Sequence, residues 1–194
     1  MASLESLFRS GDSKRDNFLS RVFGIFNEEV VRHWCANTKS KYVDLGRPTL
    51  HTADGRWHTL DFTFRDPSTS KVYVAEMKCE LAYDNYRYLR LTGADQLDHH
   101  RGAAFVRFLE TAKENHELIV KVGAKPLKSD GAILVWGATT PQGVAAVKQA
   151  TNVTDVLSLE DMIADLQRWQ DAEWKARSNQ IRTWCDDLFD FMEP

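Results

Sequence analysis

The 194-residue sequence contains no uninterrupted apolar run long enough to cross a bilayer, and its first fifteen residues lack the apolar segment of a secretory signal peptide. Its three cysteines, Cys35, Cys79 and Cys185, are odd in number and widely spaced, and they match neither a disulfide framework nor a zinc pattern. Ten glycines and five prolines are too few for a low-complexity or fibrous chain. We therefore expect a cytoplasmic protein with reduced thiols and no membrane partner.

The composition that remains is that of an ordinary globular protein, with 43% hydrophobic and 27% charged residues. The sequence shows no internal repeat, linker or low-complexity stretch, which favours a single domain over residues 1–194. Negative charge is concentrated at the C-terminal end, where residues 155–194 carry a net charge of −6 and leave +3 for the rest of the chain. A mildly basic body is compatible with a nucleic-acid substrate but does not require one.

The N-terminal half predicts one long helix followed by a β-meander. Ser13 and Asp16 form a helix start signal, and apolar residues at helical spacing follow as far as Trp34, so the helix should end near Asn37. Alternating and β-branched residues then predict three antiparallel strands, joined by turns at 53–55 and 66–70. These strands are a weak one over residues 41–50, a stronger one over 57–65 and a third over 71–81.

The C-terminal half predicts alternating helices and strands. A helix over residues 94–116 is followed by a loop over 121–130, and the continuous apolar run within 131–137 is typical of a strand buried on both faces. The remaining expected elements are a short helix capped by Thr140, a strand over 153–157, and a helix from Ser158 to about Phe189 that breaks near 178–179. The fold class is therefore α/β, with a mixed central sheet flanked by helices and a C-terminal helical extension.

Charged side chains gather on one face of the predicted strand over residues 71–81. Since side chains alternate between the faces of a strand, Glu76, Lys78 and Glu80 share one face and leave an apolar face opposite. The preceding strand supplies Asp61, and Leu60 and Phe62 on either side of it should share that strand's other face. A hairpin centred between residues 68 and 69 places Asp61 opposite Glu76.

Two adjacent carboxylates repel each other, and a divalent cation removes that repulsion. Mg²⁺ prefers oxygen ligands and binds one or two protein carboxylates while it keeps water and substrate phosphate, with Mn²⁺ as the alternative. Such an ion stabilises charge on a phosphate and activates a water molecule, and Lys78 beside Glu76 can orient that water or neutralise charge.

The pair Leu-Asp61-Phe and Ala-Glu76-Met-Lys78, separated by a turn, resembles the core motif of the PD-(D/E)XK, or restriction-endonuclease-like, nuclease superfamily. Two other acid-x-Lys sequences, at 12–14 and 173–175, lie in helical contexts without a partner acid. Leu60 stands where the name-giving proline would be. The resemblance implies a core of a helix, a three-stranded meander, a helix and a further strand, here about residues 15–158, with the helical extension over about 159–194.

The resemblance also implies further site residues. The first helix of the family often carries a glutamate within Gly-x-x-x-Glu, which Gly24 and Glu28 match, with Glu29 as the alternative ligand. Gln96 resembles a glutamine that some branches carry at the start of the helix after the catalytic strand. Glu80 matches a less common acidic residue two positions past the lysine. The implied metal ligands are thus Asp61, Glu76 and Glu28, with Lys78 and Gln96 as further catalytic residues.

Three other groups of residues have alternative interpretations. Five of the six histidines, those at 33, 51, 58, 99 and 100, match no zinc spacing and are interpreted as surface or helix-face residues. Apolar residues from Trp174 to Leu188 form a seam that packs on the core or against a second copy of the chain, which would make a homodimer. An aromatic and basic cluster after the catalytic strand can bind nucleic acid or pack its rings on the domain, and it comprises Tyr83, Tyr86, Arg87, Tyr88 and Arg90.

The sequence therefore predicts a Mg²⁺-dependent deoxyribonuclease, with endonuclease or exonuclease action left open. DNA is the expected substrate and RNA the alternative. A catalytically inactive nuclease-fold module that binds nucleic acid or a protein partner is the competing hypothesis, and a structural ion-pair cluster is the simplest alternative for Asp61, Glu76 and Lys78.

Overall fold

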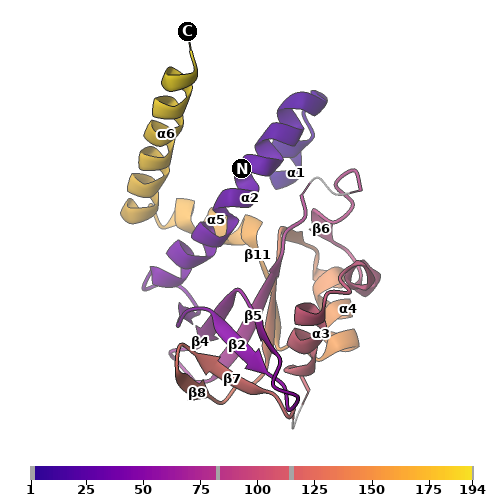
Figure 1. Ribbon diagram of the computed structural model, residues 1–194. Helices are drawn as coiled ribbons and strands as arrows, with labels where there is room; N and C mark the ends of the chain where they lie inside the picture. Colours follow the sequence, from indigo (N-terminus) through magenta and orange to yellow (C-terminus); the bar gives the residue numbers. More distant parts are fainter. Residues whose placement is uncertain (1–2, 82–83, 114–115, 194) are drawn as a thin grey trace.

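A five-stranded mixed sheet forms the centre of the fold (Figure 1). The structure, a computed structural model, describes residues 3–81, 84–113 and 116–193. In chain order the helices are α1 (Leu4–Phe8), α2 (Ser13–Ala36), the 3-10 helix η1 (Ala94–His99), α3 (Ala103–Glu110), α4 (Pro141–Thr151), α5 (Leu159–Arg168) and α6 (Ala172–Met192). The strands are β1 (Val43–Asp44), β2 (Pro48–His51), β3 (Trp57–Thr59), β4 (Phe62–Arg65), β5 (Val72–Lys78), β6 (Arg90–Leu91), β7 (Ile119–Val122), β8 (Lys125–Leu127), β9 (Ala132–Trp136), β10 (Ala138–Thr139) and β11 (Asp155–Ser158).

The central sheet has the strand order β1-β4-β5-β9-β11. Its first three strands are antiparallel neighbours, whereas β9 and β11 run parallel to β5 and to each other. All five residues of β9 are buried, which confirms that the apolar run within 131–137 is a strand covered on both faces. The prediction of an α/β fold with a mixed sheet flanked by helices is confirmed.

The two faces of β5 contribute to two different cores. Tyr73 and Ala75 pack with residues of α2 and α5 on one face, whereas Val74 packs with residues of η1, α3 and α4 on the other. The strand therefore lies inside a helix–sheet–helix sandwich. Because both faces are covered, the charged residues of β5 can reach solvent only near its C-terminal end.

The predicted strand over residues 57–65 is wrong as one element, because the chain changes sheets in its middle. The N–H of Leu60 donates to the carbonyl of Pro48 in the second, four-stranded sheet, which has the order β3-β2-β7-β8. The chain bends at Asp61 and then enters the central sheet as β4. Leu60 and Phe62 consequently pack in different cores, so the expectation that they share a face is also wrong.

Three other predicted elements need correction. The segment 41–50 divides into β1 and β2, which belong to different sheets. The helix predicted over 94–116 divides into η1 and α3, because His100 leaves the helical region and Gly102 caps a new helix; residues 114–115 lie outside the described residues. The expected loop over 121–130 contains the β7–β8 hairpin, which turns at Gly123 with a φ of +59°.

Local signals at helix starts are mostly confirmed. Thr140 caps α4, with Pro141 at its first position, and Ser158 caps α5 by accepting from the N–H of Asp161. Helix α2 begins at Ser13 as expected, but the capping side chain is that of Asp12, one residue earlier. The short helix α1 lies outside all the predicted elements.

The C-terminal helices break at residues 169–171 and not at 178–179. Helix α6 extends away from the body of the molecule beside α2 (Figure 1), and none of its residues is buried. Trp174 is partly covered by the α2–α5 core, but Trp184 and Leu188 are each about half exposed, at 50% and 55%. Core packing of the seam thus ends near Trp174, and a homodimer through α6 stays a prediction.

Two expectations concern the chain as a whole. Within the described ranges, no helix combines the length and the apolar character that a membrane span requires. Cys35, Cys79 and Cys185 are free thiols, and burial raises the pKa of Cys79 to about 12.

Candidate active site

The β4–β5 hairpin brings Asp61 and Glu76 to the same level of the central sheet. Phe62 pairs with Ala75, so the same register, extended by one residue, sets Asp61 opposite Glu76 as the sequence predicts. Asp61 itself lies in the bend before β4. Its Oδ2 accepts a hydrogen bond of 2.8 Å from the N–H of Met77, which holds this carboxylate against the catalytic-strand candidate β5.

Glu76 is a buried carboxylate with one oxygen satisfied and one not. Only 5% of the residue is exposed, and the Nζ of Lys78 lies 2.6 Å from its Oε1. Its Oε2 is buried and has no hydrogen-bond partner among the described residues. Burial and the nearby charge of Asp61 raise the pKa of Glu76, and Lys78 opposes this rise. Lys78 therefore compensates the carboxylate through Oε1, whereas Oε2 has no partner among the described residues.

Glu28 of α2 lies on the Asp61 side of the site, where Arg47 connects the two carboxylates. The Nη2 of Arg47 is 3.4 Å from Oδ1 of Asp61 and 3.8 Å from Oε1 of Glu28. Because both distances are measured from the same nitrogen, Oδ1 of Asp61 and Oε1 of Glu28 can be no farther apart than their sum. Glu28 also forms an ion pair of 2.6 Å with Arg32 one turn along α2.

Glu29, the alternative metal ligand, points toward the C-terminal helix. Both of its carboxylate oxygens accept hydrogen bonds of 2.7 Å from Arg177 of α6. Arg177 also lowers the pKa of Glu29, because its hydrogen bonds and charge favour the ionised form. This bidentate pair gives Glu29 a clear structural role, whereas Glu28 is the glutamate of α2 that shares a partner with Asp61.

Gln96 lies at the start of η1 and is 4% exposed. Its Oε1 accepts hydrogen bonds from the backbone N–H groups of Thr92 and Gly93, at 2.6 and 3.2 Å. Its Nε2 donates to the carbonyls of Arg87 and Arg90, at 2.8 and 3.0 Å. The amide thus fixes the connection that follows β5, and among the described residues none of these bonds reaches Asp61, Glu76 or Lys78.

The two arginines of the same connection form ion pairs with acidic side chains of this protein. Arg87 is 3.5 Å from Asp84, and Arg90 lies between acidic side chains of α1 and α5 at 3.6 and 3.5 Å. Tyr86 adopts a positive φ of 65°, and Tyr83 lies outside the described residues. Nucleic-acid binding by Tyr86, Arg87 and Arg90 stays a prediction.

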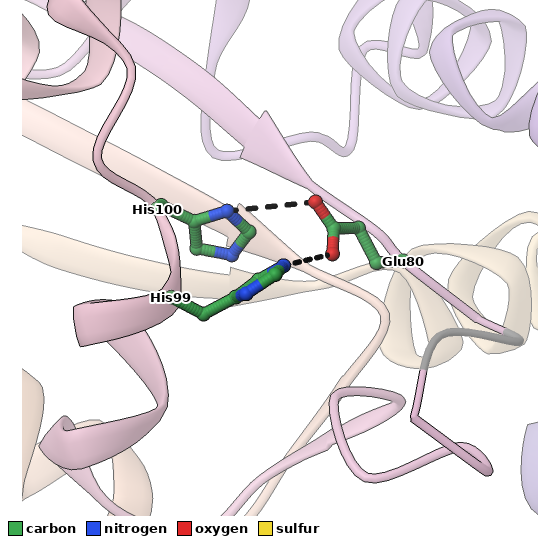
Figure 2. A group of neighbouring side chains, drawn as sticks. All are labelled: Glu80, His99 and His100. Carbon is green, nitrogen blue, oxygen red and sulfur yellow. Dashed lines mark hydrogen bonds and ion pairs between the residues drawn. The ribbon is translucent and has the colours of Figure 1, made fainter.

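A second group of ligand-type side chains lies beyond Lys78, and Figure 2 shows its members: Glu80, His99 and His100. The Nε2 of His99 is 2.8 Å from Oε2 of Glu80, and the Nδ1 of His100 is 3.5 Å from Oε1 of the same carboxylate. Burial lowers the pKa of His100 to about 4, although the charge of Glu80 opposes this shift. Spacing along the sequence gave no sign of this convergence.

Arg47 is the other residue that the sequence did not single out. It precedes Pro48 in a weakly patterned segment, and only the bend at Asp61 brings its guanidinium between two acids. The histidine pair could have been found only by recognising that the helix ends at His99. Both omissions concern contacts that depend on where the chain bends, at Asp61 and at His100, and not on local residue spacing.

Comparison with known proteins gives no match: no family model, no curated protein and no solved structure matches the chain. The function of the chain is therefore inferred from the chemistry of its own residues.

Proposed function

We propose that the chain is a metal-dependent nuclease that hydrolyses phosphodiester bonds in DNA, with Asp61 and Glu76 as ligands of Mg²⁺ and Lys78 as the catalytic cation. The observation that carries the proposal is the buried Oε2 of Glu76, which has no partner in the described part of the chain and lies beside a second carboxylate at the same level of the sheet. Two neighbouring acids with one buried, unpartnered oxygen are costly, and a bound cation reduces that cost.

The donor set fits a hard divalent cation. Asp61 and Glu76 offer carboxylate oxygens from two adjacent segments, and Glu28 offers another oxygen on the Asp61 side. Mg²⁺ is typically bound by one or two carboxylates and completes its coordination with water and phosphate oxygens, and Mn²⁺ accepts similar ligands. When bound, the ion supplies positive charge for the phosphate and an activated water molecule.

Side chains of the protein would position the attacking water and the phosphate group. The Nζ of Lys78, which lies at the C-terminal end of β5 and is partly exposed, can donate to the attacking water or to a phosphate oxygen. Asp61 is held through Oδ2 by the N–H of Met77, and its Oδ1, now 3.4 Å from Arg47, is the oxygen that would bind the ion. Arg47 is 53% exposed and can exchange its carboxylate partners for a phosphate group.

The order of elements supports the same proposal. Helix α2, the antiparallel strands β1, β4 and β5, the helical segment η1–α3 and the parallel strand β9 resemble the core of the restriction-endonuclease-like superfamily. Glu76 and Lys78 lie near the end of β5 with Asp61 opposite Glu76, an arrangement that resembles the motif of that superfamily.

One observation favours a second candidate, a catalytically inactive module of this fold. Lys78 is already paired with Glu76, and Arg47 already lies between Asp61 and Glu28. The chain thus supplies its own cations for these acids. Such a module would bind nucleic acid or a protein partner without cleaving a bond.

A nuclease assay separates the two candidates. Supercoiled plasmid, labelled linear DNA and labelled RNA are incubated with the protein in Mg²⁺, in Mn²⁺ and in EDTA. The wild type should cleave DNA only with metal, and Asp61→Asn and Lys78→Met should each lose at least about 100-fold in rate. The matched controls, Asp187→Asn and Lys125→Met, change exposed residues of α6 and β8 and should retain full activity.

Equal cleavage by the wild type and both site variants would remove the enzymatic proposal. Binding of Mn²⁺ without cleavage of any substrate would favour the inactive module. Cleavage of RNA alone would keep the site and change the substrate.

A further inference from the structure

Glu80, His99 and His100 converge from two parts of the chain that are separated by the long connection after β5. Glu80 lies two residues past the end of β5, on the same side as Lys78, whereas His99 ends η1 and His100 is its C-cap. His100 has φ −91° and ψ 87°, so the helix stops and the two imidazoles turn toward one carboxylate. In a continuous helix, neighbouring side chains diverge by about 100°.

We infer that these three side chains form a second metal site, one for a transition-metal ion of the Zn²⁺ class. This site is separate from the oxygen-ligand site of Asp61 and Glu76, and the inference does not depend on nuclease activity. One ligand atom from each residue lies within 4.8 Å of the other two. Figure 2 shows both rings directed at the two oxygens of Glu80.

The distances suit a metal ion after a small movement. Ligand atoms about 2.1 Å from a tetrahedral or octahedral ion lie about 3.0 to 3.4 Å from one another. The present nitrogen–oxygen separations are 2.8 Å for His99 and 3.5 Å for His100, on either side of that value. These separations involve Oε2 and Oε1 respectively, and the three ligand atoms lie within 4.8 Å of one another, so side-chain movement without a change of fold would bring them around an ion.

Packing holds one wall of the site and leaves another open. The ring of His100 contacts those of Phe105 and Trp136, at centroid distances of 5.3 and 5.7 Å, and its side chain is 5% exposed. The ring of Tyr88 lies 4.7 Å from that of His99. The side chains of His99 and Glu80 remain 25% and 37% exposed, so water or another ligand can complete the coordination from the open side.

The ligand types separate this site from the first one. Imidazole nitrogens suit Zn²⁺, Fe²⁺, Ni²⁺ and Cu²⁺, whereas Mg²⁺ prefers oxygen ligands alone. Two histidines and one carboxylate with an open position form the donor set of many zinc sites that keep a water ligand. The His99–Glu80 contact also connects η1 to the end of β5, so an ion there would fix the connection that Gln96 organises.

The test measures metal binding by the full-length protein after treatment with a chelator. Zn²⁺ is titrated calorimetrically, and Co²⁺ serves as a spectroscopic probe through its visible absorption. We expect one equivalent of either ion to bind. His99→Ala and Glu80→Gln should each weaken that binding at least about tenfold, whereas His58→Ala, the matched control, should not change it.

Two further measurements keep the inference falsifiable if a variant folds poorly. In the wild type, Zn²⁺ should shift the imidazole NMR signals of His99 and His100, and Asp61→Asn should leave Zn²⁺ affinity unchanged. Absence of binding, shifts at other histidines, or equal binding by His99→Ala would overturn the site. Loss of Zn²⁺ binding in Asp61→Asn would mean that the ion occupies the first site instead.

Discussion

The N–H of Met77 donates a hydrogen bond to Oδ2 of Asp61 at 2.8 Å, across the boundary between the bend before β4 and the end of β5. This contact continues the hairpin where regular pairing has stopped, because Phe62 and Ala75 are the last paired residues at that end. It holds the two candidate ligands, Asp61 and Glu76, at one level although only Glu76 lies within a strand.

Glu28 and Glu29 should respond differently to the same chemical change. Glu28→Gln replaces the negatively charged carboxylate near Asp61 by a neutral amide. This change should lower Mn²⁺ affinity or the cleavage rate about tenfold. Glu29→Gln breaks the bidentate pair with Arg177 and should lower the melting temperature by about 1 to 3 °C, with activity retained. Calorimetric titration and thermal unfolding of both variants measure these effects, and loss of activity in Glu29→Gln alone would reverse the assignment.

Removal of Arg47 should strengthen metal binding. Its guanidinium lies within 4 Å of both Asp61 and Glu28, so it repels an incoming cation and competes for the same oxygens. We expect Arg47→Ala to bind Mn²⁺ about threefold more tightly in calorimetric titration. Arg65→Ala, an exposed arginine of β4, is the control and should not differ from the wild type. Weaker binding by Arg47→Ala would show that Arg47 supports the site.

Glu76 should make stability depend on pH in the absence of metal. Its pKa in the folded protein is raised above the ordinary value of 4.5 by burial and by Asp61, against the opposing effect of Lys78. The folded state therefore keeps this proton to higher pH than the unfolded chain does, and stability falls as pH rises from that ordinary value through the raised pKa. In EDTA, Glu76→Gln should gain stability relative to the wild type over this window.

Urea unfolding of both proteins at several pH values measures that difference. Mg²⁺ should then stabilise the wild type more than Glu76→Gln, because ligand binding to the folded state adds to its stability. If the free energies of unfolding of the wild type and Glu76→Gln differed by a constant amount from about pH 4.5 to 8, titration of Glu76 would not be the cause of the pH dependence.

Gln96 should contribute to stability whether or not metal is present. Its buried amide satisfies four backbone groups in the connection between β5 and η1. Truncation to alanine leaves those groups without partners and should cost about 2 to 3 kcal/mol in urea unfolding. Gln149→Ala, an exposed site on α4, is the matched control. A cost below about 0.5 kcal/mol, with a large loss of activity, would favour a direct role in the site.

The sequence predicted those features that depend on short-range pattern. Alternation along residues 71–81 gave the two faces of β5, and the turn at 66–70 gave the register that sets Asp61 opposite Glu76. The continuous apolar run gave β9, and the caps at Thr140 and Ser158 gave the starts of two helices. In each case the physical cause is the local pattern of one strand, turn or helix start.

The features that were missed depend on distant contacts. The pattern of 57–65 looks like one strand, but pairing of Leu60 with Pro48 draws its first half into another sheet. Helical spacing continues through His99 and His100, although η1 stops there and both rings turn to Glu80. Arg47 reaches Asp61 only because of the same bend. Local propensity cannot reveal a choice that tertiary pairing makes.

Because the chain bends at Leu60 and Asp61, these two consecutive residues are hydrogen-bonded to different sheets. Leu60 is hydrogen-bonded into the four-stranded sheet, and Asp61 is hydrogen-bonded to the end of β5. A single peptide unit therefore separates a residue anchored in the four-stranded sheet from a candidate metal ligand held by the central sheet. A displacement of Leu60 relative to β5 would strain the hydrogen bond between Asp61 and Met77.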